Sequence, residues 1–167
     1  MSARRPGAVR PPPGQESVWD YPRPPRLEPT TKRIQVIFAG VSIADTTRAW
    51  RVLETSHPPV YYLPPDDVRS DLLLRSVRTS LCEWKGRAAY WSVVVGERTA
   101  RDAVFGYPQP SAAFHAIRGH VAFYAGAMDA CTVDDELVTP QPGHFYAGWI
   151  TRDIVGPFKG GPGTAGW

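Results

Sequence analysis

The hydrophobic pattern of residues 33–155 predicts a protein built mainly from short β-strands. Ile34, Val36 and Phe38 alternate with polar positions, which is typical of a strand with one buried face. Residues 88–95 are largely apolar at both the odd and the even positions. This pattern predicts a central strand that is covered on both faces of its sheet. Glycine and proline separate about eight such segments along the chain.

Helical patterns are confined to two short stretches. Residues 111–117 predict a helix in which Ser111 is the N-cap and Phe114 and Ile117 share one face. Residues 64–69 predict a single helical turn with acidic residues near its start. Many short strands with one or two short helices favour a compact domain that is mainly β and barrel-like or two-sheeted.

Composition divides the chain into three parts. Residues 1–32 are rich in proline and arginine and predict an extended arm, of which residues 1–15 are expected to be disordered. Residues 33–155 are expected to form a single β domain, and residues 156–167 a glycine-rich tail. The arm carries the whole net charge of +3, because acidic and basic residues balance after residue 32. A basic nucleic-acid-binding surface on the domain is therefore not expected.

The sequence also argues against several other classes of protein. No apolar run reaches the roughly 18–20 residues that span a bilayer, and the first residues lack the apolar stretch of a secretory signal. The two cysteines, Cys82 and Cys131, form no C-x-x-C motif, and the four histidines show no metal-ligand spacing. We therefore expect a cytoplasmic protein that binds no membrane, metal or cofactor.

Glu54 and His57 precede a pair of prolines at a predicted strand end. Because the prolines stiffen the backbone, they suit an imidazole that acts as a general base or binds an anion. The alternative is that His57 only caps the strand through its own hydrogen bonds. Glu54 is expected to point inward, where a carboxylate must be paired or protonated. A partner such as Arg51, Arg101 or Lys85 would make it a structural ion pair, whereas an open cleft would make it an acid–base group.

A second polar segment lies at the predicted hairpin turn around residues 82–86. Strand alternation places Glu83 and Lys85 on one face and Cys82 and Trp84 on the other. If the first face lines a cleft, Lys85 meets an anionic ligand and Glu83 sets its charge; if it faces water, the two form a surface pair contributing ~0–1 kcal/mol. Cys82 fits a small buried side chain better than a nucleophile.

Aromatic residues from several predicted strands are candidates for the wall of a pocket. Tyr62, Tyr90, Trp91, Tyr107 and Tyr124 have the flat faces that bind a ring such as a nucleobase. His120 shares a strand face with Tyr124 and is placed to close the site. The alternative for all six residues is ordinary core packing.

The sequence resembles a family known as domain of unknown function 427. The resemblance rests on Glu54-Thr-Ser-His57-Pro-Pro and Cys82-Glu-Trp-Lys85-Gly and covers roughly residues 30–130. Actinobacterial-type members of the family also share the Trp-Asp-Tyr-Pro-Arg-Pro-Pro arm at residues 19–25 and the Gly-Pro-Phe-Lys-Gly-Gly end at residues 156–161. The resemblance implies a small β-tent fold, and members have been labelled nucleotidyltransferase-like.

These observations favour a domain that binds a small polar or nucleotide-like ligand in a cleft lined by Glu54, His57 and Lys85. In an enzyme these three residues would carry acid–base or electrostatic catalysis, and the resemblance implies a transferase. The alternative is a non-catalytic binding or scaffold module that uses its proline-rich arm and aromatic surface. A third hypothesis, redox chemistry at Cys82, would need Cys131 as the resolving thiol. The sequence predicts no oligomeric state.

Overall fold

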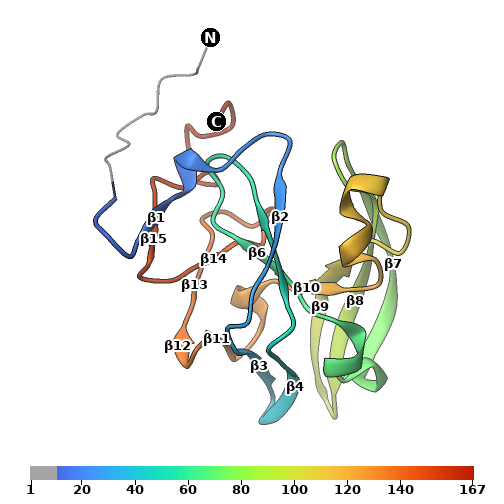
Figure 1. The fold of residues 1–167 in the computed structure, drawn as a ribbon. Helices are drawn as coiled ribbons and strands as arrows, with labels where there is room; N and C mark the ends of the chain where they lie inside the picture. Colours follow the sequence, from blue (N-terminus) through green and yellow to red (C-terminus); the bar gives the residue numbers. More distant parts are fainter. Residues whose placement is uncertain (1–10) are drawn as a thin grey trace.

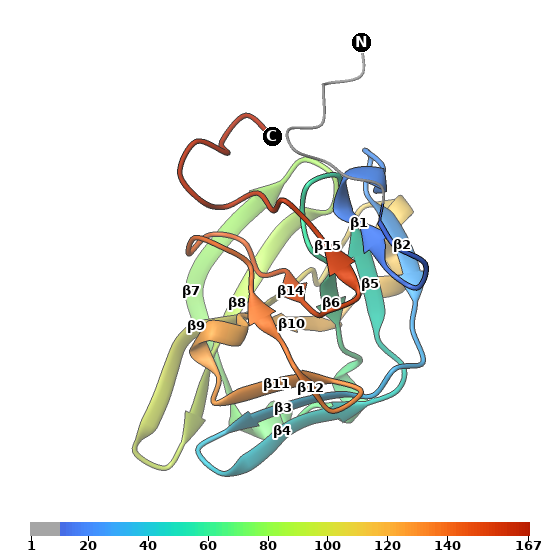
Figure 2. The ribbon, with the colours of Figure 1, turned by 90° about the vertical axis from the view of Figure 1, so that its left-hand side faces the viewer.

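The computed structural model describes residues 11–167 and confirms a protein that is mainly β. Its strands form five sheets, and none of them closes into a barrel within these residues (Figures 1 and 2). Most of the segment that we expect to be disordered, residues 1–15, lies outside the described residues. The helices of the described chain are too short and too polar to cross a membrane.

The largest sheet is antiparallel and stands at one side of the molecule (Figure 1). Its strands, in the order β10-β9-β8-β7, are β7 (Leu73–Cys82), β8 (Gly86–Val95), β9 (Arg98–Gly106) and β10 (Val121–Phe123). The predicted hairpin of residues 80–95 is confirmed as the β7–β8 pair. β8 has a neighbour on each side, and Ala88, Ala89 and Tyr90 are all buried, so the prediction of a central strand is confirmed.

A second antiparallel sheet packs against the first and forms the lower edge of the molecule in Figure 2. Its strands, in the order β12-β11-β3-β4, are β3 (Ile34–Phe38), β4 (Val41–Thr46), β11 (Ala130–Val133) and β12 (Glu136–Leu137). The alternating residues Ile34, Val36 and Phe38 are at most 3% exposed. They share one hydrophobic core with Val93 and Val104 of the first sheet, and this contact joins the two sheets.

Three smaller sheets include strands from both ends of the described chain. Their strands are β2 (Arg26–Pro29), β5 (Trp50–Leu53) and β6 (Val60–Tyr62), in the order β2-β5-β6; β1 (Glu16–Ser17) with β15 (Ile154–Val155); and β13 (Thr139–Pro140) with β14 (Trp149–Ile150). The β1–β15 pair is parallel and the other pairs are antiparallel. The amino-terminal segment is therefore hydrogen-bonded into the fold through β1 and β2.

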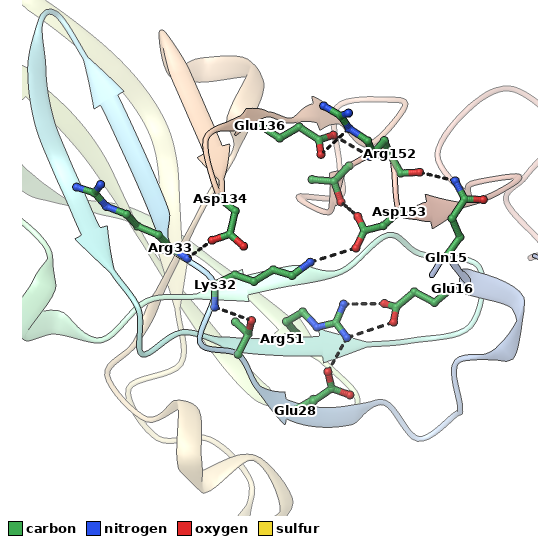
Figure 3. Close-up of polar contacts among 12 residues, drawn as sticks. Gln15, Glu16, Glu28, Lys32, Arg33, Arg51, Asp134, Glu136, Arg152 and Asp153 are labelled. Atoms are coloured by element: carbon green, nitrogen blue, oxygen red, sulfur yellow. Dashed lines mark hydrogen bonds and ion pairs between the residues drawn. The ribbon is translucent and has the colours of Figure 1, made fainter. Parts of the chain in front are cut away.

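A buried arginine fixes these two strands to β5 (Figure 3). Arg51 is 9% exposed, and its guanidinium contacts Glu16 of β1 and Glu28 of β2, each at 2.6 Å. Nearby, Lys32 Nζ lies 3.1 Å from a carboxylate oxygen of Asp153, which follows β14. Two ion-pair systems therefore tie the amino-terminal segment to the rest of the fold.

The last residues of the chain pack on the same segment. Trp19 is buried, and its indole N–H donates to the carbonyl of Pro157 at 2.9 Å. The rings of Trp19 and Trp167 meet edge to face with their centroids 5.4 Å apart. Phe158 also packs against the small core that contains Trp19 and Tyr21. Segments from opposite ends of the sequence thus share one core.

Five single-turn or two-turn 3₁₀-helices complete the described fold. They are η1 (Val18–Asp20), η2 (Pro65–Asp67), η3 (Ser70–Leu72), η4 (Ala112–Ile117) and η5 (Ala125–Ala127). In η4, Phe114 and Ile117 are buried as predicted. Ser111 is the N-cap residue as predicted, but its side chain forms no capping hydrogen bond, because its hydroxyl donates to the carbonyl of Trp84 at 2.7 Å. This bond joins η4 to the turn between β7 and β8.

Candidate functional site

The two predicted polar segments meet at one cavity of about 360 Å³. It lies between the sheet strands β7–β9, the corner after β5, and the segment that joins β13 to β14. The predicted site residues that line it are Glu54, His57, Tyr62, Cys82, Glu83, Lys85, Tyr107 and Tyr124. We call this space the aromatic cavity, because tyrosine, phenylalanine and tryptophan side chains form much of its wall.

The corner that carries Glu54 and His57 is held from both ends of the chain. Its central residue, Ser56, is fully buried and has a φ of 73°, in the left-handed region that costs a non-glycine residue about 1 kcal/mol or more. The Ser56 N–H donates to the carbonyl of Val18 at 3.0 Å, and its carbonyl accepts the Lys159 N–H at 2.9 Å. These two bonds fix the turn that directs both predicted side chains toward the cavity.

The hydrogen bonds around His57 define the tautomer of its ring. Gln141 Oε1 accepts the N–H of Gly148 at 3.0 Å, so its amino group faces His57 and donates to Nδ1 at 3.0 Å. Because Nδ1 accepts, the ring proton lies on Nε2, which is 3.5 Å from Glu54 Oε2. His57 therefore has a partner at each ring nitrogen, as the structural interpretation of this residue requires.

Glu54 is an ionised carboxylate with two partners. Arg23 Nε lies 3.2 Å from Glu54 Oε2, and the same oxygen faces His57. Burial raises the pKa of Glu54, but the hydrogen bonds from His57 and Arg23 outweigh this effect and hold the pKa at about 2. None of its three predicted basic partners forms an ion pair with it among the described residues, although the charge of Lys85 also lowers its pKa.

Lys85 is a buried cation that forms no ion pair with a carboxylate of residues 11–167. It is 9% exposed and lines the aromatic cavity, and no carboxylate of residues 11–167 lies within 4.0 Å of it. Its ammonium instead lies 5.6 Å from the ring centroid of Tyr107 and 5.9 Å from that of Phe114. By contrast, the buried Arg51 contacts two carboxylates.

The turn between β7 and β8 departs from the predicted alternation. β7 ends at Cys82, so Glu83, Trp84 and Lys85 belong to a turn rather than to a strand. Consequently all four residues line the aromatic cavity, and the predicted division of this segment into two faces is wrong. Glu83 is exposed at the rim, whereas Lys85 is buried.

Phenol and phenyl rings form the inner wall of the cavity. The centroid of Phe105 is 6.0 Å from that of Tyr62, 6.4 Å from that of Tyr107 and 5.4 Å from that of Tyr124. Burial raises the pKa of Tyr124 to about 12 and that of Tyr62 well above its usual value. These hydroxyls are therefore neutral near pH 7 and offer the cavity flat apolar faces with uncharged polar edges.

Three of the residues proposed for chemistry lie away from this cavity. Trp91 and His120 line a separate cavity of about 320 Å³, which shares Tyr107 with the aromatic cavity. Trp91 follows Tyr90 on β8, and successive residues of a strand point to opposite faces. Cys131 lies in the core between the two large sheets and does not line the aromatic cavity, so the structure gives Cys82 no neighbouring thiol there.

Several residues that line or support the cavity were not predicted from the sequence patterns. Arg23 and Lys159 lie in the arm and the end segment, where the sequence resemblance is only an expectation, and both lie outside the residues that the family model matches. Gln141, Phe145 and Tyr146 come from a loop that the sequence pattern leaves unassigned. The Tyr146 ring meets the His57 ring edge to face at 4.7 Å, so this loop completes the surroundings of the imidazole.

Comparison with known proteins gives a family but no activity. A family model described as a domain of unknown function (DUF427) matches residues 26–134. The matched region includes the corner with Glu54 and His57 and the turn with Lys85, but excludes Arg23 and Gln141. No curated protein matches the chain. Within residues 11–167, no group of three or more histidine, cysteine, aspartate or glutamate side chains is arranged to hold a metal ion.

Proposed function

Because the chain belongs to the DUF427 family, whose description names no activity, we propose its function from the aromatic cavity. The protein binds a small, polar, nucleotide-like molecule there, with an anionic group beside Lys85 and a flat ring against the tyrosine wall. The observation that carries this proposal is the buried ammonium of Lys85, which lacks a carboxylate partner among the described residues.

The electrostatics of the cavity support an anionic ligand. A buried ammonium is stable only with compensating interactions, and two aromatic faces supply only part of what a counter-ion would supply. Glu54, the acidic residue whose pKa the charge of Lys85 lowers, is already paired with Arg23. A carboxylate or phosphate on a ligand would give Lys85 its missing partner.

The aromatic wall supports a ring as the second recognition element. Tyr62, Phe105 and Tyr107 lie around one end of the cavity with centroids 6.0 to 6.4 Å apart. Such side chains bind flat ligands through offset or edge-to-face contacts. Ligand pockets of this size combine apolar walls with a few polar groups, and here Lys85 and the Glu54–His57 pair are those groups.

The hydrogen bonds of His57 favour binding over acid–base catalysis by this residue. A general base needs a free ring nitrogen, but Nδ1 accepts from Gln141 and Nε2 faces Glu54. A transferase reaction at this site would therefore have to displace Gln141 or use another group. Both cysteines are free thiols, which fits the cytoplasmic location that we expect.

The alternative of a scaffold module that works through its arm has less support. Trp19 and Tyr21 are buried in the fold, and Arg23 bonds to Glu54 and to the backbone oxygen of Trp167. A partner that captured this part of the arm would have to break these contacts. The arm therefore favours a structural role beside the cavity.

A binding screen with matched lysine variants tests the proposal. Thermal shift with nucleotides, phosphorylated metabolites and aromatic carboxylates identifies ligands, and calorimetry compares Lys85→Met with Lys32→Met. Lys32 is a surface lysine outside the cavity. We expect Lys85→Met to weaken binding by at least ~tenfold, because charged hydrogen bonds contribute about 1.5–3 kcal/mol, and Lys32→Met to bind normally. A panel without any ligand, or equal binding by both variants, would refute the proposal.

A further inference from the structure

A second hollow of about 500 Å³ adjoins the aromatic cavity. The two spaces share four lining residues, Tyr124, Gln141, Tyr146 and Ala147. We call the second space the arginine hollow, because Arg78 and Arg101 line it and neither lines the aromatic cavity. The shared residues mean that the same loop between β13 and β14 borders both spaces.

The two spaces follow one another along the same strands. On β9, Arg101 and Ala103 line the arginine hollow, and Phe105, at the next alternate position, lines the aromatic cavity. On β7, Arg78 lines the hollow and Ser80 lines the cavity. The cavity lining along these two strands therefore changes from aromatic to cationic.

The arginines of the hollow are available to a ligand. Both side chains are exposed, and no carboxylate of residues 11–167 lies within 4.0 Å of either guanidinium, whereas Arg98 of the same sheet pairs with Asp129. The guanidinium carbon of Arg78 lies 4.3 Å from the ring centroid of Tyr90, which lines the aromatic cavity. One acidic residue, Asp102, also lines the hollow, so its charge balance is positive.

We propose that the ligand is an elongated molecule with an anionic group at each end. Its ring and first anionic group occupy the aromatic cavity with Lys85, and its second group, a phosphate or phosphonate, lies between Arg78 and Arg101. The planar guanidinium group donates two parallel hydrogen bonds to such oxygens, which suits phosphate better than a single ammonium does. This inference rests on the proposed function, because it extends the ligand of the same cavity.

Matched synthetic probes measure separately how each end of the ligand contributes to the binding affinity. The probes are 4-alkylbenzoates and their counterparts that carry a terminal phosphonate, with alkyl linkers of two, four and six methylene groups. Calorimetry measures each probe with the wild-type protein, the double variant Arg78→Gln/Arg101→Gln, and Arg87→Gln. Arg87 is the matched control, because it is an exposed arginine of β8 that lines neither space and has no carboxylate within 4.0 Å in the described chain.

We expect the best phosphonate probe to bind the wild-type protein roughly tenfold more tightly than its alkylbenzoate partner. The double variant should lose this advantage and Arg87→Gln should keep it. Equal affinities throughout the series, or an advantage that survives in the double variant, would overturn the inference while leaving Lys85-dependent benzoate binding intact. If neither kind of probe binds the wild-type protein, this inference is overturned, whereas the panel of nucleotides, phosphorylated metabolites and aromatic carboxylates decides the proposed function separately.

Discussion

Replacing Glu54 with glutamine tests whether the ion pairs at the corner after β5 stabilise the fold. The Glu54 side chain is 22% exposed and contacts both Arg23 and His57. Its pKa is about 2 in the folded protein, against 4.5 for the unfolded chain. At 1.36 kcal/mol for each tenfold change in proton affinity, the difference corresponds to about 3 kcal/mol of stability at pH 7.

The pH dependence of this contribution has a definite sign. Because the folded pKa is the lower of the two, the contribution of Glu54 is complete above the unfolded pKa and is lost as the pH falls toward 2. About 1 kcal/mol of it remains at pH 3. The wild-type protein should therefore lose about 2 kcal/mol more than Glu54→Gln between pH 7 and pH 3.

Urea denaturation at pH 7, 5, 4 and 3, followed by tryptophan fluorescence, measures this difference. The comparison with the variant removes the effects of other carboxylates that titrate in the same range, because both proteins contain them. Glu83→Gln is the matched control, since Glu83 lines the same cavity but is exposed at its rim. If the stabilities of the wild-type protein and Glu54→Gln fall in parallel, the ion pairs do not act as the geometry implies.

Three further predictions concern other parts of the fold. Iodoacetamide should label Cys82 and spare Cys131, because Cys131 is buried and burial raises its pKa to about 12; equal labelling by mass spectrometry would contradict this burial. Arg51→Met should lower the free energy of unfolding by about 2 kcal/mol, since it leaves two half-buried carboxylates without their shared cation, and a loss below about 0.5 kcal/mol in urea denaturation would argue against that role. Gln141→Leu should remove the donor to the histidine Nδ1 and change the tautomer balance, which ¹⁵N chemical shifts report; an unchanged spectrum would exclude the assigned hydrogen bond.

Strands with regular alternation could be predicted from the sequence, whereas the edge strand could not. Residues 34–38 form β3 as their pattern predicts, because one face meets the core and the other does not. The first half of β7 gave no pattern, because it lies at a sheet edge, is largely exposed, and has an irregular register between Arg75 and Thr79. Two-residue strands such as β1 depend on a partner more than a hundred residues away, which no local pattern encodes.

The candidate site shows the same division between local and distant information. Glu54, His57 and Lys85 lie in compact motifs beside predicted turns, and the structure brings them to one cavity. Trp91 does not join them because it is one position from Tyr90, and a shift of one residue in a strand reverses the face. The alternation of side chains along a strand could not identify the ion-pair partner of Glu54. That partner, Arg23, comes from a segment whose path depends on tertiary contacts.

The amino-terminal segment has a consequence for the charge of the cavity. Without Arg23, the ionised Glu54 would be the natural counter-charge for Lys85, and the cavity would have little preference for anions. With Arg23 in contact with Glu54, that negative charge is already compensated, and Lys85 keeps a net attraction for an external anion. Arg23 lies outside the residues that the family model matches. The preference for an anion that we propose for this cavity thus depends on a contact from the arm as well as on the family motifs.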